Sequence, residues 1–217
     1  MTRRHDPAWV WMIGALIGAL AIAGAVLAGY GTGPAGLTQG LRVTARWSFL
    51  FFWLSYASGA MATLFGPAFA GLARRARALG LAFATALQVH IGLVVWLGVA
   101  TGQIPLQGGI LLFFLAGLFC TYLLVLLSFG IGTRNLGRLW RPLLLLATTY
   151  ILIAFGRDFV LGALDPTNQQ WPYAAEYVPF ALLSLIAIPL RLAPLLRQRF
   201  DVLPVSTKPA RRALADR

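Results

Sequence analysis

The strongest constraint on the fold is a long uncharged stretch in the middle of the chain. It runs from Ala78 to Thr133 without an aspartate, glutamate, lysine or arginine, and a polar segment at 101–109 interrupts it. About 20 apolar residues cross the hydrocarbon core of a bilayer when each adds about 1.5 Å of helix rise. The stretch is therefore predicted to form two membrane-spanning helices, 79–100 and 109–129, joined by a tight turn.

The overall composition agrees with a membrane protein. Of the 217 residues, 59% are hydrophobic and 11% are charged, whereas about a quarter of the residues of a soluble domain are charged. The net charge of +12 would suggest a nucleic-acid partner in a soluble protein. However, no basic stretch outside the apolar segments has interleaved aromatic residues, so we expect no nucleic-acid binding. The single cysteine, Cys120, excludes an intrachain disulfide and a cluster of thiolate metal ligands.

Four further apolar segments complete the predicted architecture. They cover 8–30, 47–64, the uncharged core 142–156 and 173–195. The core 142–156 is short for a span, so its helix must extend past Arg141 and Arg157, or these two side chains must reach the membrane surfaces. We therefore predict an all-α membrane protein, a six-helix transmembrane bundle over 8–196, with a cytoplasmic leader at 1–7 and a basic cytoplasmic tail at 197–217.

The distribution of positive charge predicts the orientation. Most of the 18 lysine and arginine residues lie in the leader, in the loop after the second span, in the turn after the fourth span and in the tail. Because cytoplasmic loops are enriched in these residues, both termini are predicted to be cytoplasmic. We expect contact with anionic lipid or with a partner protein at six arginines of the two connections: Arg74, Arg75, Arg77, Arg134, Arg138 and Arg141.

His90 is the main candidate for chemistry. It is the one histidine that can lie at membrane depth, and only Gln88 is comparably polar in the same predicted span. An imidazole inside a membrane needs a partner. One interpretation is a heme ligand, because helix bundles hold heme between facing helices through axial histidines. The other is a hydrogen bond to a tyrosine, a serine or a backbone carbonyl of a neighbouring helix.

Two sequence motifs resemble a known family. The segment Arg75–Leu81, followed by His90, resembles the third helix of the ferric-reductase-like transmembrane domain. The segment Arg134–Leu143 is similar to the Arg-x-Leu-Gly-x-x-Trp-x-x-Leu-His motif that opens the fifth helix of the family, and Thr44–Trp47 is a weaker match. The resemblance covers about residues 40–165, and within the family it points to the heme-binding membrane subunits of the methionine-sulfoxide reductase type.

This resemblance implies a multi-pass protein of a bacterial-type inner (plasma) membrane that transfers electrons through heme b. Among the positions of the family's heme ligands, His90 is a histidine, whereas Leu144 and Arg157 stand where two other histidines are expected. The implied function is an electron-transfer subunit with one heme, bound by the iron to His90, that exchanges electrons with a quinone or a separate redox protein. The alternative is a heme-free membrane scaffold or assembly partner that keeps the fold.

Two further groups of residues leave both a functional and a structural interpretation open. Arg157 and Asp158 could form a site at the outer surface, or they could be an interfacial pair that ends a short helix. Thr148, Thr149 and Tyr150 could line a quinone pocket, or they could bond to their own helix or to a neighbouring one. A transporter is not favoured, because no acidic residue lies at the centre of a predicted span.

Overall fold

The computed structural model describes residues 7–103, 106–131, 136–165 and 173–201, and every regular element in these ranges is a helix. Six helical segments are long and apolar enough to cross a membrane, which confirms the predicted helical membrane architecture. The spans are formed by α1 (Ala8–Tyr30), α2 (Pro34–Phe65), α4 (Ala76–Thr101), α5 (Gly108–Ser128), α7 (Trp140–Leu164) and α8 (Tyr173–Asp201). Short helices precede α4 and α7, namely η1 (Pro67–Phe69), α3 (Ala70–Arg74) and η2 (Gly137–Leu139).

The second span begins earlier than its sequence predicts. The sequence predicts a span over 47–64, but α2 is helical from Pro34 and includes part of the glycine-rich segment 31–41. Proline suits the first turn of a helix because its missing N–H would have no partner there. The helix ends at Gly66, whose φ of 83° is a left-handed value that a glycine adopts without strain. As a result, Arg42 lies inside a helix of 32 residues.

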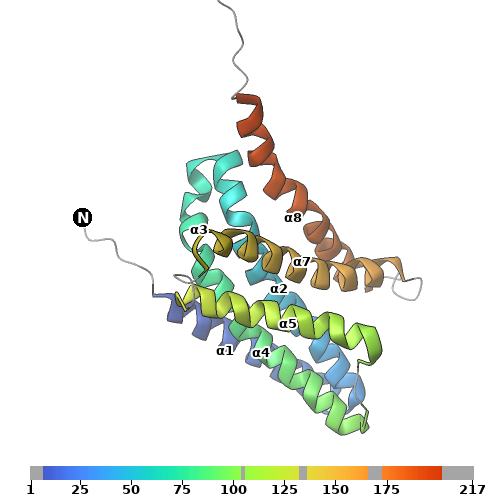
Figure 1. Cartoon of the computed structure of the whole chain (residues 1–217). Coiled ribbons are helices and arrows are strands. Elements are labelled where there is room, and N and C mark those ends of the chain that lie inside the picture. The colour runs from blue at the N-terminus through green and yellow to red at the C-terminus, as the bar shows by residue number, and fades with distance from the viewer. Residues whose placement is uncertain (1–6, 104–105, 132–135, 166–172, 202–217) are drawn as a thin grey trace, which may run out of the picture.

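The fifth span is longer than its uncharged core. α7 continues past Arg157 and Asp158 to Leu164, which is the first of the two arrangements expected for this short segment. The last span, α8, contains three prolines and runs to Asp201. Figure 1 shows the end of α7 near the start of α8, with α5 alongside α7 and with α1 next to α4.

Aromatic packing fills the centre of the bundle. Phe49 of α2 is completely buried, and its ring centroid lies 5.0 Å from that of Phe159 on α7. We call the connected rings the phenylalanine cluster, which comprises Phe49, Phe52, Phe83, Phe155, Phe159 and Phe180. Rings at such separations add to the stabilisation that comes from packing. The cluster joins α2, α4, α7 and α8.

The alternation of six spans gives the bundle two chemically different ends. The basic end carries the connection between α2 and α4, the start of α7 and the end of α8. Its exposed arginines in the described residues are Arg74, Arg75, Arg77, Arg138 and Arg141. The opposite end carries the connections from α1 to α2, from α4 to α5 and from α7 to α8. Which end faces the cytoplasm stays a prediction from the positive-inside rule.

Candidate functional site

His90 lies on α4 and faces α2. Its Nδ1 is 3.2 Å from the hydroxyl oxygen of Thr44, and a backbone hydrogen bond joins the ring to Leu41. The Thr44 hydroxyl donates its single proton to the Gly40 carbonyl at 2.8 Å, so it accepts a hydrogen bond from the Nδ1–H of His90. With the proton assigned to Nδ1 in this way, Nε2 would be the ring nitrogen that keeps a lone pair.

A cavity of about 460 Å³ opens beside this imidazole, between α2, α4, α7 and α8. We call it the His90 hollow. Its polar lining consists of Arg42, Arg46, His90, Asp158, Asp165 and Tyr177. The structure therefore brings Asp158 to the same cavity as His90, whereas Arg157 does not line it. The Arg157 Nη1 lies 3.1 Å from the Asp158 carboxylate, and both side chains are substantially exposed.

A buried charge pair stands next to the hollow and was not found from the sequence. The Arg46 Nη2 and the Glu176 Oε2 are 3.0 Å apart and join α2 to α8. The Arg46 guanidinium also lies over the ring of Tyr177, 4.9 Å from its centroid. The paired atoms are not aligned as a hydrogen bond, and the Arg46 Nε has no hydrogen-bond partner in the described residues. The contact is therefore a charge–charge attraction, and the buried Nε–H of Arg46 has no hydrogen-bond acceptor in the described residues.

Among the residues of the hollow, His90 is the one that could bind a heme iron, and both arginines and aspartates line the space beside it. His90 would offer Nε2 to iron while its Nδ1–H is held by Thr44, the arrangement that fixes metal-binding imidazoles. Arg42 and the unbonded N–H of Arg46 would offer positive charge to the carboxylates of the heme. The described residues contain no group of three or more histidine, cysteine or acidic side chains that could hold a metal ion. The phenylalanine cluster fills the centre of the bundle. The space for a heme beside His90 is therefore limited to the hollow.

The other candidate residues are dispersed. Leu144, Thr148 and Arg77 line a second cavity towards the basic end. Tyr150 lines neither cavity. Its hydroxyl donates to the Phe113 carbonyl of α5 at 3.0 Å. Gln88 accepts a hydrogen bond of 2.9 Å from the Tyr122 hydroxyl. The remaining basic-end arginines expected at the lipid surface are exposed, as described above, and Arg134 lies outside the described residues. Thr149 is half-buried on α7.

Comparison with known proteins adds no assignment: no protein-family model, characterised protein or solved structure matches the chain. The similarity to the ferric-reductase-like domain rests on the two sequence motifs alone.

Proposed function

We propose that the chain is a membrane electron-transfer subunit of the ferric-reductase-like type that holds a single heme b in the His90 hollow. The observation that supports this proposal best is the imidazole itself. Thr44 holds the ring at the wall of a cavity of about 460 Å³ that also contains two arginines. A cavity of this size lies within the usual range of small-molecule and cofactor sites, about 300–1,000 Å³.

In this proposal the residues of the chain hold and orient the cofactor. His90 is the iron ligand, and its bond to Thr44 keeps Nδ1 protonated so that Nε2 is available. Arg46 is kept in place by Glu176 and Tyr177 and faces the anionic groups of the cofactor together with Arg42. When bound, heme b supplies one-electron transfer. His90 is the one histidine of the described spans that would hold the heme.

The proposed setting is a bacterial-type inner (plasma) membrane with both termini in the cytoplasm. The apolar faces of the six helices suit a lipid bilayer as their surroundings. The concentration of arginine at the basic end supports this orientation. A quinone or a separate redox protein would exchange electrons with the heme. Because the hollow opens towards the opposite end, we expect that exchange on the side of the protein away from the basic end.

A heme-free membrane scaffold or assembly partner is the alternative, and a specific observation favours it. Six phenylalanines fill the centre of the bundle between the spans that carry His90 and Leu144. Leu144 and Arg157 stand where the resemblance expects further histidines, and Arg157 has an adjacent carboxylate as its partner. A chain that had lost its cofactor would need such packing to remain stable, since an empty cavity in a core is costly.

The test is the absorption spectrum of the full chain, expressed with added 5-aminolevulinate and purified in a mild detergent. We expect a Soret band and a difference between the reduced and oxidised spectra, with about one heme per chain by the pyridine hemochrome assay. His90→Ala should abolish the band. Gln88→Ala is the matched control, because Gln88 lies on the same helix and does not line the hollow. If the wild-type protein shows no heme band after this expression, the proposal is contradicted and the heme-free scaffold is the function that is favoured.

A further inference from the structure

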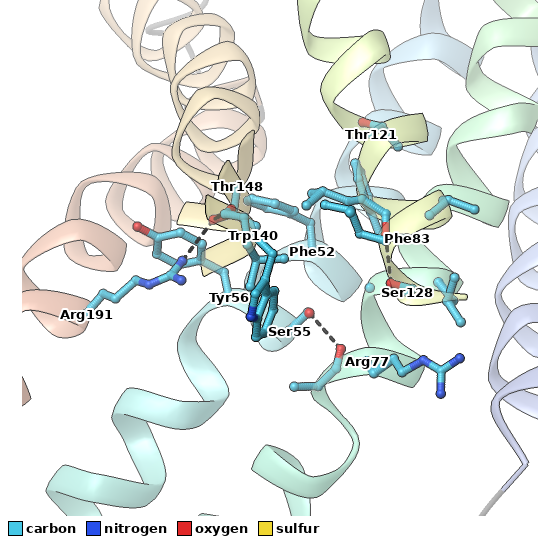
Figure 2. A pocket seen from close by; sticks show the side chains of 17 residues that line it. Phe52, Ser55, Tyr56, Arg77, Phe83, Thr121, Ser128, Trp140, Thr148 and Arg191 are labelled. Atoms are coloured by element: carbon cyan, nitrogen blue, oxygen red, sulfur yellow. Dashed lines mark hydrogen bonds between the residues drawn. The ribbon is translucent and has the colours of Figure 1, made fainter. Parts of the chain in front are cut away.

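The second cavity of the bundle has a different chemical character from the His90 hollow and shares no lining residue with it. It has a volume of about 450 Å³ and is lined by residues of five helices, α2, α4, α5, α7 and α8. We call it the basic-end cavity. Figure 2 shows Arg191 and Arg77 on opposite sides of this cavity, with Trp140, Tyr56 and Phe52 between them.

Arg191 is the most unusual residue of this cavity. It belongs to the 20-residue segment Ala175–Pro194 that is apolar enough to span a membrane. It stands near the end of this segment, where an arginine side chain commonly extends towards the membrane surface. Its Nη1 donates to the Thr148 hydroxyl at 3.1 Å, and its guanidinium lies 4.3 Å from the centre of the Tyr56 ring. The guanidinium therefore points into the bundle, as Figure 2 shows.

No carboxylate neutralises this charge within the part of the chain that the structure describes. The recorded ion pairs involve Arg46 and Arg157, and neither Arg191 nor Arg77 is joined to an acidic side chain there. Glu176, Asp158 and Asp165 lie towards the opposite end of the bundle. The basic-end cavity thus presents two arginines without an acidic counterpart among the described residues.

The serine and threonine hydroxyl groups of the cavity offer only acceptor oxygens to a ligand. The Ser55 hydroxyl donates to the Ala76 carbonyl at 2.7 Å, and the Ser128 hydroxyl donates to the Leu124 carbonyl at 2.8 Å. Thr121 and Thr148 donate to carbonyls of their own helices in the same way. The charged donors that remain are the two guanidinium groups, and most of the other lining is aliphatic or aromatic. A matching ligand has an anionic head and an apolar body.

The position of the cavity identifies the source of such a ligand. Arg77 and Trp140 are exposed, so the cavity meets the surface at the basic end of the bundle. Tryptophan is typical of the interface between membrane and water. Exposed arginines around this end attract anionic lipid, and basic pockets between transmembrane helices bind anionic lipid head groups. The head groups of one leaflet therefore lie where the cavity opens.

We propose that the basic-end cavity binds one anionic phospholipid. Arg191 contacts the phosphate, Arg77 attracts it from the exposed opposite side of the cavity, and the apolar wall formed by α5 and α7 contacts the start of an acyl chain. The site combines Arg191, which points into the bundle, with the exposed Arg77 at the surface, whereas the exposed Arg74, Arg75, Arg138 and Arg141 do not line it. This proposal is independent of the heme, because the two cavities have no residue in common.

The test is native mass spectrometry of the delipidated full chain, titrated with dioleoylphosphatidylglycerol or with dioleoylphosphatidylcholine. We expect one tightly bound phosphatidylglycerol and weaker binding of the zwitterionic lipid. Arg191→Gln and Arg77→Gln should each weaken phosphatidylglycerol binding about fivefold, the contribution of one arginine beside an anionic lipid. Arg191→Lys should weaken phosphatidylglycerol binding less than Arg191→Gln does, because lysine keeps the positive charge. The matched control is Arg138→Gln, since Arg138 is exposed at the same end and lies outside the cavity.

Each other outcome counts against the proposal. If Arg138→Gln weakens binding as much as Arg191→Gln does, the lipid is attracted by surface charge alone. If inorganic phosphate competes with the lipid at equal concentration, the site is a free-anion site. If decylubiquinone displaces the lipid and the arginine variants bind normally, the cavity is a quinone site. Should Arg191→Gln fail to fold, Arg77→Gln decides the test, because the exposed Arg77 side chain has no packing role to lose.

Discussion

The buried pair of Arg46 and Glu176 makes a quantitative prediction about stability. The Arg46 side chain is 10% exposed and the Glu176 side chain 27% exposed. Glu176→Gln removes the negative charge and keeps the size of the side chain, so Arg46 is left as an unpaired charge inside the bundle. Breaking a fully buried pair costs about 3–5 kcal/mol. Because Glu176 is partly exposed and Tyr177 still covers the guanidinium, we expect a smaller loss than for a fully buried pair, about 2–3 kcal/mol.

Unfolding by sodium dodecyl sulfate in mixed micelles, followed by tryptophan fluorescence, measures this free energy. The double variant Arg46→Met/Glu176→Leu replaces both charges with apolar groups, and we expect it to lie within about 1 kcal/mol of the wild type. A double-mutant cycle with the single variants Arg46→Met and Glu176→Leu then gives the coupling energy. The matched control is Arg157→Gln. Its pair with Asp158 is exposed, so its loss should cost less than about 1 kcal/mol.

Two results would refute this reasoning. If Glu176→Gln is no more destabilising than Arg157→Gln, the Arg46 charge is not separated from water and the pair does not hold α2 against α8. If the double variant loses the sum of the two single losses, the residues act independently. The second result would mean that Arg46 stabilises the bundle through its contacts with Tyr177 and Phe180, and not through Glu176.

The six spans could be read from the sequence because charge is so costly in hydrocarbon that uncharged stretches mark the helices. The start of α2 at Pro34 could not be predicted in this way. Glycine, threonine and glutamine between 31 and 41 resemble a loop in composition, yet Leu37 is completely buried and packs with Ala23 and Leu93. Tertiary packing therefore outweighs the weak helix propensity of glycine. The prediction that the span starts at Trp47 also hid Thr44, the partner of His90.

The charged contacts were the other feature that the sequence did not reveal. Glu176 is the only glutamate of the chain, and its pairing with Arg46 joins helices that lie far apart in the sequence. Hydrophobic periodicity does not show which charged side chains of two distant helices will meet. Arg191 stands near the end of the last span in the sequence, where a side chain commonly reaches towards the surface. Only the contacts with Thr148 and Tyr56 show that it points inwards.

Two further predictions concern the packing around the candidate site. Thr44→Val removes the hydrogen-bond partner of the His90 Nδ1. Purified protein should then retain roughly ten times less heme, which is the smallest loss usually seen when the residue bonded to a metal ligand is replaced. Equal heme retention in the variant and the wild type would contradict this role of Thr44. Phe49→Ala removes the completely buried ring of the phenylalanine cluster and should cost about 3–5 kcal/mol in unfolding by sodium dodecyl sulfate. Phe119→Ala is its control, because that ring is 67% exposed and its loss should change the free energy by about 0.5 kcal/mol or less. Equal losses for both variants would mean that the aromatic centre does not hold the four helices together.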